Sequence, residues 1–236
     1  MIFPRLAHRQ VQPEIMDQPD LDRARHGHAL RGLATVNALS QSWRLPWTSL
    51  AAFAREHGVI RVLDLACGGG DVTMRLARKA QRVKAEIEIE GCDMSPTALD
   101  IAKSRAEGFG APVAFFQHDL LSGGIPAGYD VLVNSLFMHH WPGEDALDLL
   151  KNMRDEARLG VIVSDLNRTA AGYLASHIAC RIVTRSSVVH YDAPRSVEAA
   201  FTPGEFAELA REAGFTNFTL RRQWPFRFLF VGHTHD

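Results

Sequence analysis

Over residues 59–166, short apolar segments alternate with segments of helical spacing, and this alternation restricts the possible folds more than any other feature of the chain. The expected helices are Thr73–Lys84, a helix from Ser95-Pro96 to about Glu107, and Glu144–Arg158. The expected strands are Val59–Leu65, residues 87–91, Val113–Gln117, Asp130–Ser135 and Val161–Asp165. Strands that alternate with helices predict a parallel sheet with both faces covered. We therefore expect an α/β, doubly wound fold.

The segments on either side of Val59–Asp165 depart from this alternation. Residues 20–57 have helical spacing, with a break expected at Pro46. After the fifth strand, Ala170–Arg185 is expected to be helical, and Val188–Ser196 is expected to be a turn-rich connection. The sequence therefore predicts an N-terminal helical lid, residues 1–58, and a core domain, residues 59–236, with a helical insert at 167–200.

The last part of the chain completes the predicted sheet. Thr202–Ala213 is expected to form a helix, because a hydroxyl at the N-cap and Glu205 three residues later make a capping box. Phe218–Trp224 and Phe226–His233 are expected to be strands on either side of Pro225. With the five strands above, the sheet is expected to have seven.

Composition excludes several functional classes. The 236 residues carry 26 basic and 27 acidic side chains, so no overall field attracts the chain to nucleic acid. The sequence has no run of about 18 apolar residues, which predicts no membrane span. Its three cysteines are an odd number, which favours a reducing cytoplasm. They show no zinc-ligand spacing, which predicts no metal site. We expect a cytoplasmic monomer or homodimer.

The strongest local signal is a glycine loop at residues 66–70, between the first strand and the next helix. Glycines there let the backbone approach a ligand, although a tight turn without a ligand would use them too. Asp93 lies 23 residues after Gly70, where an acid can accept hydrogen bonds from ribose hydroxyls. The glycines are contiguous and the helix begins with Asp71, which would repel a diphosphate. A dinucleotide oxidoreductase is therefore disfavoured.

At these residues the chain resembles the class I S-adenosylmethionine-dependent methyltransferases. Asp64, Gly68 and Gly70 match the first motif of that family, and Ala66 stands where the family has its first glycine. The resemblance covers roughly residues 55–235 and implies a Rossmann-like, mostly parallel seven-stranded sheet with an antiparallel last strand.

The resemblance also implies the cofactor, S-adenosyl-L-methionine, and the residues around it. Asp93 would contact the ribose, Met94 the adenine, and Asp119 the region near the adenine amino group. The fourth strand would end beside the sulfonium. The implied cofactor contacts are Asp64, Ala66, Cys67, Gly68, Gly70, Asp93, Met94, His118, Asp119, Leu120, Asn134 and Ser135.

Histidines are the candidate catalytic residues. His139 and His140 follow the fourth strand, where the family places residues that line the methyl-transfer pocket, and a histidine can deprotonate a hydroxyl near neutral pH. The alternative is that the pair caps the following helix. His190 is a further catalytic candidate. The predicted substrate contacts are Trp47, Tyr173, Tyr191 and Arg195, the last as a partner for an anionic acceptor, although ordinary packing and a solvated helix face would also explain them.

A small molecule is the expected acceptor. The fourth strand ends in Asn134-Ser135-Leu136-Phe137, without the two prolines typical of enzymes that methylate amino groups in DNA. The general shape resembles bacterial methyltransferases that tailor quinones and polyketides. We expect methyl transfer to an oxygen of a phenol, enol or carboxylate. The alternatives are a carbon methyltransferase of quinone biosynthesis and a noncatalytic partner subunit that binds the cofactor.

Overall fold

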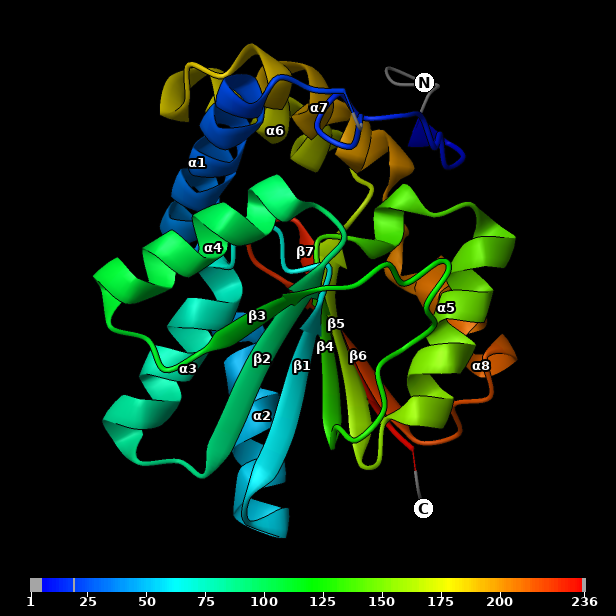
Figure 1. Ribbon diagram of the computed structural model, residues 1–236. Helices are drawn as coiled ribbons and strands as arrows, with labels where there is room; N and C mark the ends of the chain where they lie inside the picture. Colours follow the sequence, from blue (N-terminus) through cyan, green and yellow to red (C-terminus); the bar gives the residue numbers. More distant parts are fainter. Residues whose placement is uncertain (1–5, 19, 235–236) are drawn as a thin grey trace.

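A computed structural model describes residues 6–18 and 20–234 of the chain. Its centre is a seven-stranded sheet with the order β3-β2-β1-β4-β5-β7-β6 (Figure 1). The first five strands are parallel, and β7 is antiparallel to both β5 and β6. The predicted fold is confirmed, including the antiparallel last strand. The strands are β1 (Ile60–Leu65), β2 (Ile87–Asp93), β3 (Ala114–Gln117), β4 (Val131–Ser135), β5 (Gly160–Leu166), β6 (Phe218–Gln223) and β7 (Arg227–His233).

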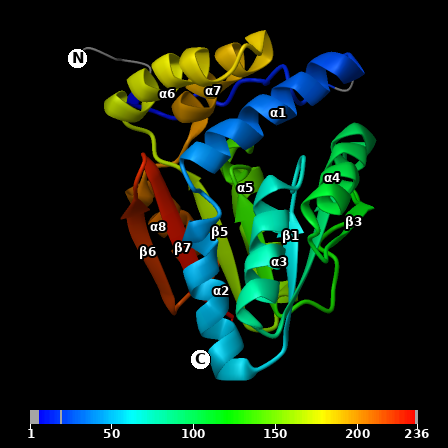
Figure 2. The same ribbon diagram turned by 90° about the vertical axis from the view of Figure 1, so that its left-hand side faces the viewer.

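Helices cover both faces of the sheet (Figure 2). One face carries α2 (Arg44–His57), α3 (Asp71–Val83) and α4 (Pro96–Phe109), and the other carries α5 (Gly143–Glu156) and α8 (Pro203–Glu212). Each helix buries one apolar stripe, and burial of a Leu or Phe side chain contributes about 1.5–3 kcal/mol. None of the helices formed by the described residues is both long and apolar enough to cross a membrane.

The N-terminal helical segment breaks earlier than predicted. It forms α1 (Arg23–Leu39) and α2, separated at residues 40–43, while Pro46 lies in the first turn of α2. The prediction of a break at Pro46 was wrong, because the first turn of a helix tolerates a proline that has no N–H to donate. The two helices also have different surroundings. Leu50 and Phe53 of α2 pack on the sheet, whereas α1 lies above the ends of the strands (Figure 2).

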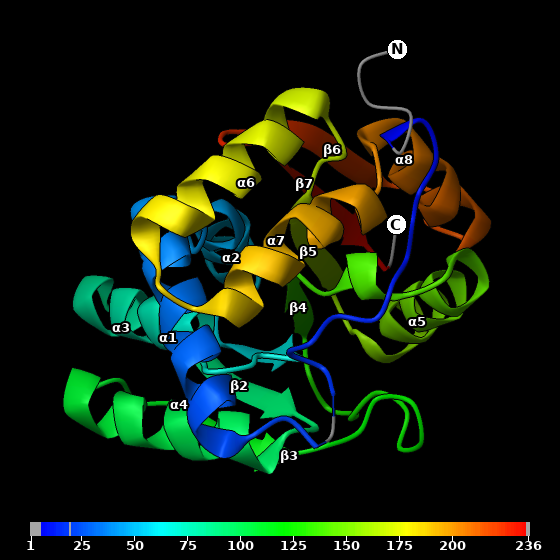
Figure 3. The same ribbon diagram turned by 90° about the horizontal axis from the view of Figure 1, so that it is seen from above.

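The insert at 167–200 consists of two helices, α6 (Ala170–Val183) and α7 (Ser187–Ala199). The prediction that Val188–Ser196 is a turn-rich connection was wrong. Ser186 caps α7 through a hydrogen bond from Val189 N, and the buried Val188 and Val189 pack with Ala29 of α1. This tertiary burial outweighs the turn-forming composition. Together α1, α6 and α7 form a layer above the carboxyl ends of the parallel strands (Figure 3).

The C-terminal elements agree with the predictions. Thr202 and Glu205 form the capping box of α8, with Glu205 N donating to Thr202 Oγ1 (3.3 Å) and Thr202 N donating to Glu205 Oε2 (2.7 Å). The β6–β7 pair follows and extends the sheet beyond β5.

Candidate active site

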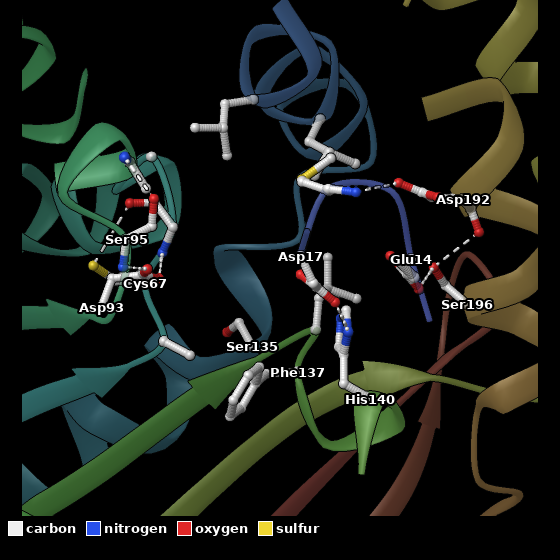
Figure 4. Close-up of a pocket in the computed structure, with 18 of the residues that line it drawn as sticks. Glu14, Asp17, Cys67, Asp93, Ser95, Ser135, Phe137, His140, Asp192 and Ser196 are labelled. Atoms are coloured by element: carbon white, nitrogen blue, oxygen red, sulfur yellow. Dashed lines mark hydrogen bonds and ion pairs between the residues drawn. The ribbon is translucent and has the colours of Figure 1, made fainter. Parts of the chain in front are cut away.

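A cavity of about 760 Å³ lies where the parallel strands end, beneath the layer of α1, α6 and α7. The glycine loop and the end of β2 line one side, with Cys67, Asp93 and Ser95 (Figure 4). Opposite them lie His140, Asp17 and, further across, Glu14. In doubly wound folds, ligands bind in the crevice outside the carboxyl ends of the strands. The cavity is therefore the candidate active site.

The glycine loop has a left-handed backbone at three positions. The φ angles are +54° at Ala66, +54° at Gly68 and +69° at Gly70. Ala66 thus adopts a conformation that favours glycine, at the position where the family has one. Gly68 lines the cavity, whereas Gly70 does not. Gly70 is instead the N-cap of α3 and packs against Phe115.

Two buried carboxylates beside the loop have oxygens without hydrogen-bond partners among the described residues. Thr73 Oγ1 donates to Asp64 Oδ2 (2.6 Å), but Asp64 Oδ1 and Asp71 Oδ2 are unpaired. Burial raises the pKa of Asp64 to about 7 and also raises the pKa of Asp71. A buried anion without a partner is costly, so this end of the cavity is suited to a cationic ligand.

Asp93 and the residues after it hold the adjoining backbone. Gly68 N donates to Asp93 Oδ2 (2.8 Å) and Ser95 N donates to Asp93 Oδ1 (2.9 Å). The predicted cofactor contacts that line the cavity here are Asp93, Met94, His118, Asp119 and Leu120.

At the end of β4, only one of the two predicted residues reaches the cavity. Ser135 lines it, and its hydroxyl is buried and has no partner within residues 6–18 and 20–234. Asn134 lies beneath the loop instead, where its Nδ2 donates to Leu65 O (3.0 Å). Alternate side chains of a strand point to opposite faces, which separates these two neighbours. The prediction that Asn134 contacts the cofactor is not supported, and Asn134 supports the loop from below.

His139 lies in a short 3₁₀ turn, η2 (Met138–His140), directly after β4. Its Nδ1 is 2.7 Å from Asp165 Oδ1, and its backbone N donates to Asp165 Oδ2 (3.0 Å). Burial alone would raise the pKa of Asp165. The charge of His139 and the hydrogen bond that it donates outweigh burial and lower this pKa. The carboxylate therefore fixes the ring and leaves Nε2 toward the cavity.

His140 is paired with a different acid. Its Nδ1 is 2.8 Å from Asp17 Oδ2, and its ring centroid lies 4.4 Å from that of His139. Burial opposes the charged form of His140, yet the hydrogen bond with Asp17 and the charge of Glu14 outweigh it and raise the pKa of His140 to about 9. At neutral pH His140 is mainly protonated, which makes it a poor base in this state.

Both acids belong to residues 6–18, which we call the N-terminal strap (Figure 3). Arg9 attaches the strap by donating to Trp141 O and Ala199 O, each at 2.7 Å. Further along, Ile15 N and Met16 N donate to the Asp192 carboxylate of α7 (2.9 and 3.1 Å). The strap thereby carries Glu14 and Asp17 over the histidines.

Several predicted site residues lie outside the cavity lining. Trp47 packs against the sheet on α2, and His190 Nε2 bonds Thr184 O at 2.7 Å. The Arg195 guanidinium stacks on the Tyr191 ring, 3.4 Å from its centroid. The prediction that these residues contact the reacting molecules is not supported by their placement. The predicted residues that do not line the cavity are Trp47, Gly70, Asn134, Tyr173, His190, Tyr191 and Arg195.

The arginine that does line the cavity is Arg227, at the start of β7. It is buried, donates to Asn37 Oδ1 (3.1 Å), and leaves Nη1 without a partner among the described residues. No sequence motif marked Arg227, Glu14 or Asp17. Asp165 could have been found, because it is an acid at the carboxyl end of a central strand.

Part of the chain that forms this cavity is similar in sequence to a known protein family. Residues 62–160, which span β1 to the start of β5, match the family described as "Methyltransferase domain". This segment of the chain is therefore similar to a methyltransferase domain. The match confirms the resemblance to class I S-adenosylmethionine-dependent methyltransferases, and the domain supplies the glycine loop, Asp93 and the histidine pair.

Curated relatives of the methyltransferase domain include two from quinone pathways. The chain is 28% identical over 227 residues to the ubiquinone biosynthesis O-methyltransferase of Ralstonia nicotianae, covering 93% of this chain and 81% of that protein. It is 36% identical over 85 residues to the demethylmenaquinone methyltransferase of Thermus thermophilus, covering 36% and 37%. The chain spans 27%, 37% and 62% of the lengths of the first three curated relatives it matches.

Solved structures share the fold of the methyltransferase domain. The plantazolicin methyltransferase BpumL, in complex with S-adenosylhomocysteine (SAH), aligns with a TM-score of 0.65 and 15% identity, covering 92% of this chain and 91% of that one. SAH is the product form of the cofactor that the sequence predicts.

Proposed function

We propose that this chain transfers a methyl group from S-adenosyl-L-methionine to an oxygen of a small-molecule acceptor. The observation that carries the proposal is one cavity that contains both Asp64, whose Oδ1 has no partner among the described residues, and His139, which Asp165 holds at the other end. The first feature suits a cationic cofactor, and the second suits an acidic hydroxyl. The match to the methyltransferase domain supports this assignment.

The residues at the loop fit the cofactor. Asp64 and Asp71 offer unpaired anionic oxygens to its ammonium group, Asp93 lies where a ribose would reach, and the exposed Met94 offers an apolar surface to adenine. When bound, the cofactor supplies an activated methyl group on a sulfonium. The protein then has to align the acceptor with that methyl and exclude water.

The acceptor end combines apolar walls with a few polar atoms. Phe137, Trp141 and Leu166 line it, while Trp141 Nε1 and Arg227 Nη1 have no partners among the described residues. Such a lining is typical of a site for a mainly apolar ring with one or two polar substituents. Arg227 takes over the role predicted for Arg195, which is to attract an anionic oxygen of the acceptor. We propose that α1, the strap and the insert act as the lid of this site.

Carbon methylation is the second candidate. The 36% identity to a demethylmenaquinone methyltransferase favours it, and the ring-sized apolar end of the cavity would hold a quinol in either orientation.

Incubation with methyl-labelled cofactor and a library of phenols, enols and carboxylic acids tests the proposal. We expect a product heavier by one CH₂ group, and base hydrolysis or fragmentation of the product identifies a methyl bound to oxygen. Label that stays on a ring carbon would favour the second candidate. SAH binding without transfer to any acceptor would contradict both and favour a noncatalytic binding protein.

Cofactor affinity should depend on pH through Asp64. Its pKa is raised to about 7, so below that pH most molecules must lose a proton before the carboxylate can pair with the ammonium group. We expect the affinity for SAH to fall by up to about tenfold per pH unit below 7, with proton uptake by the buffer on binding. Calorimetry between about pH 6 and pH 8 in buffers of different ionisation enthalpy measures both.

The matched variants for this test are Asp64→Asn and Asp119→Asn. Asp64→Asn should bind SAH more weakly at the upper end of the range and should lose the pH slope. The pKa of Asp119 is lowered by hydrogen bonds from Leu121 N and the Ser122 hydroxyl, so it stays ionised throughout and its variant should keep the slope. An equal slope in wild type and Asp64→Asn would remove Asp64 from the ammonium site.

A further inference from the structure

Three potential metal ligands meet at the acceptor end of the cavity. Glu14, His139 and His140 each offer one ligand atom, and these atoms all lie within 4.8 Å of one another. The His139 Nε2 is 3.8 Å from Glu14 Oε1. The strap contributes one ligand and η2 contributes the other two, so the cluster exists only in the folded chain.

Each of the three side chains is held by a second polar group. Asp165 bonds Nδ1 of His139 (2.7 Å), and Asp17 bonds Nδ1 of His140 (2.8 Å). The Ser196 hydroxyl donates to Glu14 Oε1 (2.6 Å) (Figure 4). Carboxylates on Nδ1 hold a ring proton there and leave Nε2 as the atom that can bind a metal ion, which is how metal-binding histidines are usually held. A helix-capping role for the pair would not require these carboxylates.

The charge around the cluster also favours a cation. Asp17, Asp165 and Asp192 surround Glu14 and the histidines, and Glu14, Asp165 and Asp192 are buried. Among the described residues, Arg9 and Arg227 lie near Asp165 and His26 lies near Asp17, and both arginines donate hydrogen bonds to other residues. A divalent cation held by the three side chains would offset part of the negative charge of these buried carboxylates.

We propose that Glu14, His139 and His140 bind a divalent transition-metal cation of the zinc class. Two imidazoles and one carboxylate form a donor set that zinc accepts, with further positions left open. Ligand atoms around a tetrahedral zinc ion stand roughly 3.3 Å apart for bonds of about 2 Å, so the three side chains must draw together by about 1.5 Å at most. The open positions face the cavity.

This inference rests on the proposed function and adds how the acceptor oxygen is activated. An acceptor hydroxyl at an open position of the ion loses its proton to solvent more readily, because the cation stabilises the oxyanion. The oxygen then forms the new O–C bond while the C–S bond breaks, and the electron pair of that bond stays on sulfur to give SAH. Neither histidine has to accept the proton.

Metal analysis of the full chain, prepared without a histidine tag, tests the site. After treatment with a chelator and titration with Zn²⁺, we expect one tightly bound ion per chain. Replacement with Co²⁺ should give the intense visible absorption of a low-coordinate cobalt site. Glu14→Gln and His140→Ala should each weaken Zn²⁺ binding by more than the roughly 10- to 100-fold that is typical for loss of an outer-shell partner, because each removes a direct ligand. His177→Ala, which changes an exposed histidine of α6, should bind as wild type does.

The outcomes separate this inference from the proposed function. If no ion binds stoichiometrically, or if Glu14→Gln and His140→Ala bind Zn²⁺ as tightly as wild type, the site does not exist. Undiminished methyl transfer by metal-free protein would overturn the role of the ion and leave the proposed function standing. Stoichiometric Zn²⁺ binding with no methyl transfer to any acceptor would leave the metal site standing and contradict the proposed function.

Discussion

His139→Asn is expected to lower the turnover of methyl transfer by about 10²- to 10⁴-fold while SAH binds as it does to wild type. The asparagine amide can still donate to Asp165 from the position of the imidazole Nδ1, but it has no atom at the position of Nε2. Turnover falls because the acceptor oxygen loses its base. If a divalent cation is bound at Glu14, His139 and His140, turnover falls because the cation loses one of its ligands. SAH binding is kept because the glycine loop and Asp93 hold the cofactor at the other end of the cavity.

Steady-state kinetics and SAH calorimetry on the same preparations measure this prediction. His139→Ala is the less conservative companion, and it removes the side-chain partner of the buried Asp165, so its thermal stability must be measured as well. Asp165→Asn should lower turnover less, and the double variant should be no worse than His139→Asn alone, because the two groups act as one unit. Turnover within twofold of wild type in His139→Asn would show that Nε2 has no part in the reaction.

Gly70→Ala is expected to lower the free energy of unfolding by about 2–4 kcal/mol and to abolish measurable SAH binding. A methyl group at this position would lie 2.7 Å from Cζ of Phe115 and 3.0 Å from Cβ of Ala102, and the φ of +69° is strained for alanine. The glycine loop would have to move, and with it Gly68, which lines the cofactor end of the cavity and donates to Asp93. SAH binding is lost because this end of the cavity is displaced.

Gly110→Ala is the matched control for this substitution. Gly110 ends α4 with a φ of +63°, and a methyl group there would meet nothing within 4 Å. Its alanine variant should lose only the backbone contribution, about 1–2 kcal/mol, and should bind SAH normally. Chemical unfolding of both variants compares them. If the two lose the same stability, contact with Phe115 is not the reason that position 70 requires glycine.

The local sequence pattern was sufficient to predict most of the helices and strands. The alternation of strands and helices over residues 59–166 and the Thr202 capping box predicted elements that the structure contains, because these signals act within a few residues. Val188–Ser196 was predicted wrongly, because its composition favours turns while its burial against α1 favours a helix. Only the neighbouring helix decides between the two.

The cofactor end of the candidate site could be predicted from local sequence, whereas the surroundings of the histidines at the acceptor end could not. At the cofactor end, the glycine loop and Asp93 are each adjacent to a strand end, so their spacing in the sequence already indicated their common position. At the acceptor end, the sequence indicated His139 and His140 but not what surrounds them. Glu14 and Asp17 arrive on a strap more than a hundred residues earlier in the chain, and Arg227 arrives on the last strand.

The sequence by itself therefore determined the sheet and its glycine loop, because strand and helix periodicity and a glycine-rich turn are local properties of the chain. Tertiary structure decided which charged side chains share the cavity with the histidines. Arg195 was expected there and instead stacks on Tyr191, while Arg227 lies there with its Nη1 unpaired among the described residues. Packing of the strap and of α7 over the strand ends determines which charged side chains reach the cavity. The spacing of residues along the chain does not indicate contacts between segments so far apart.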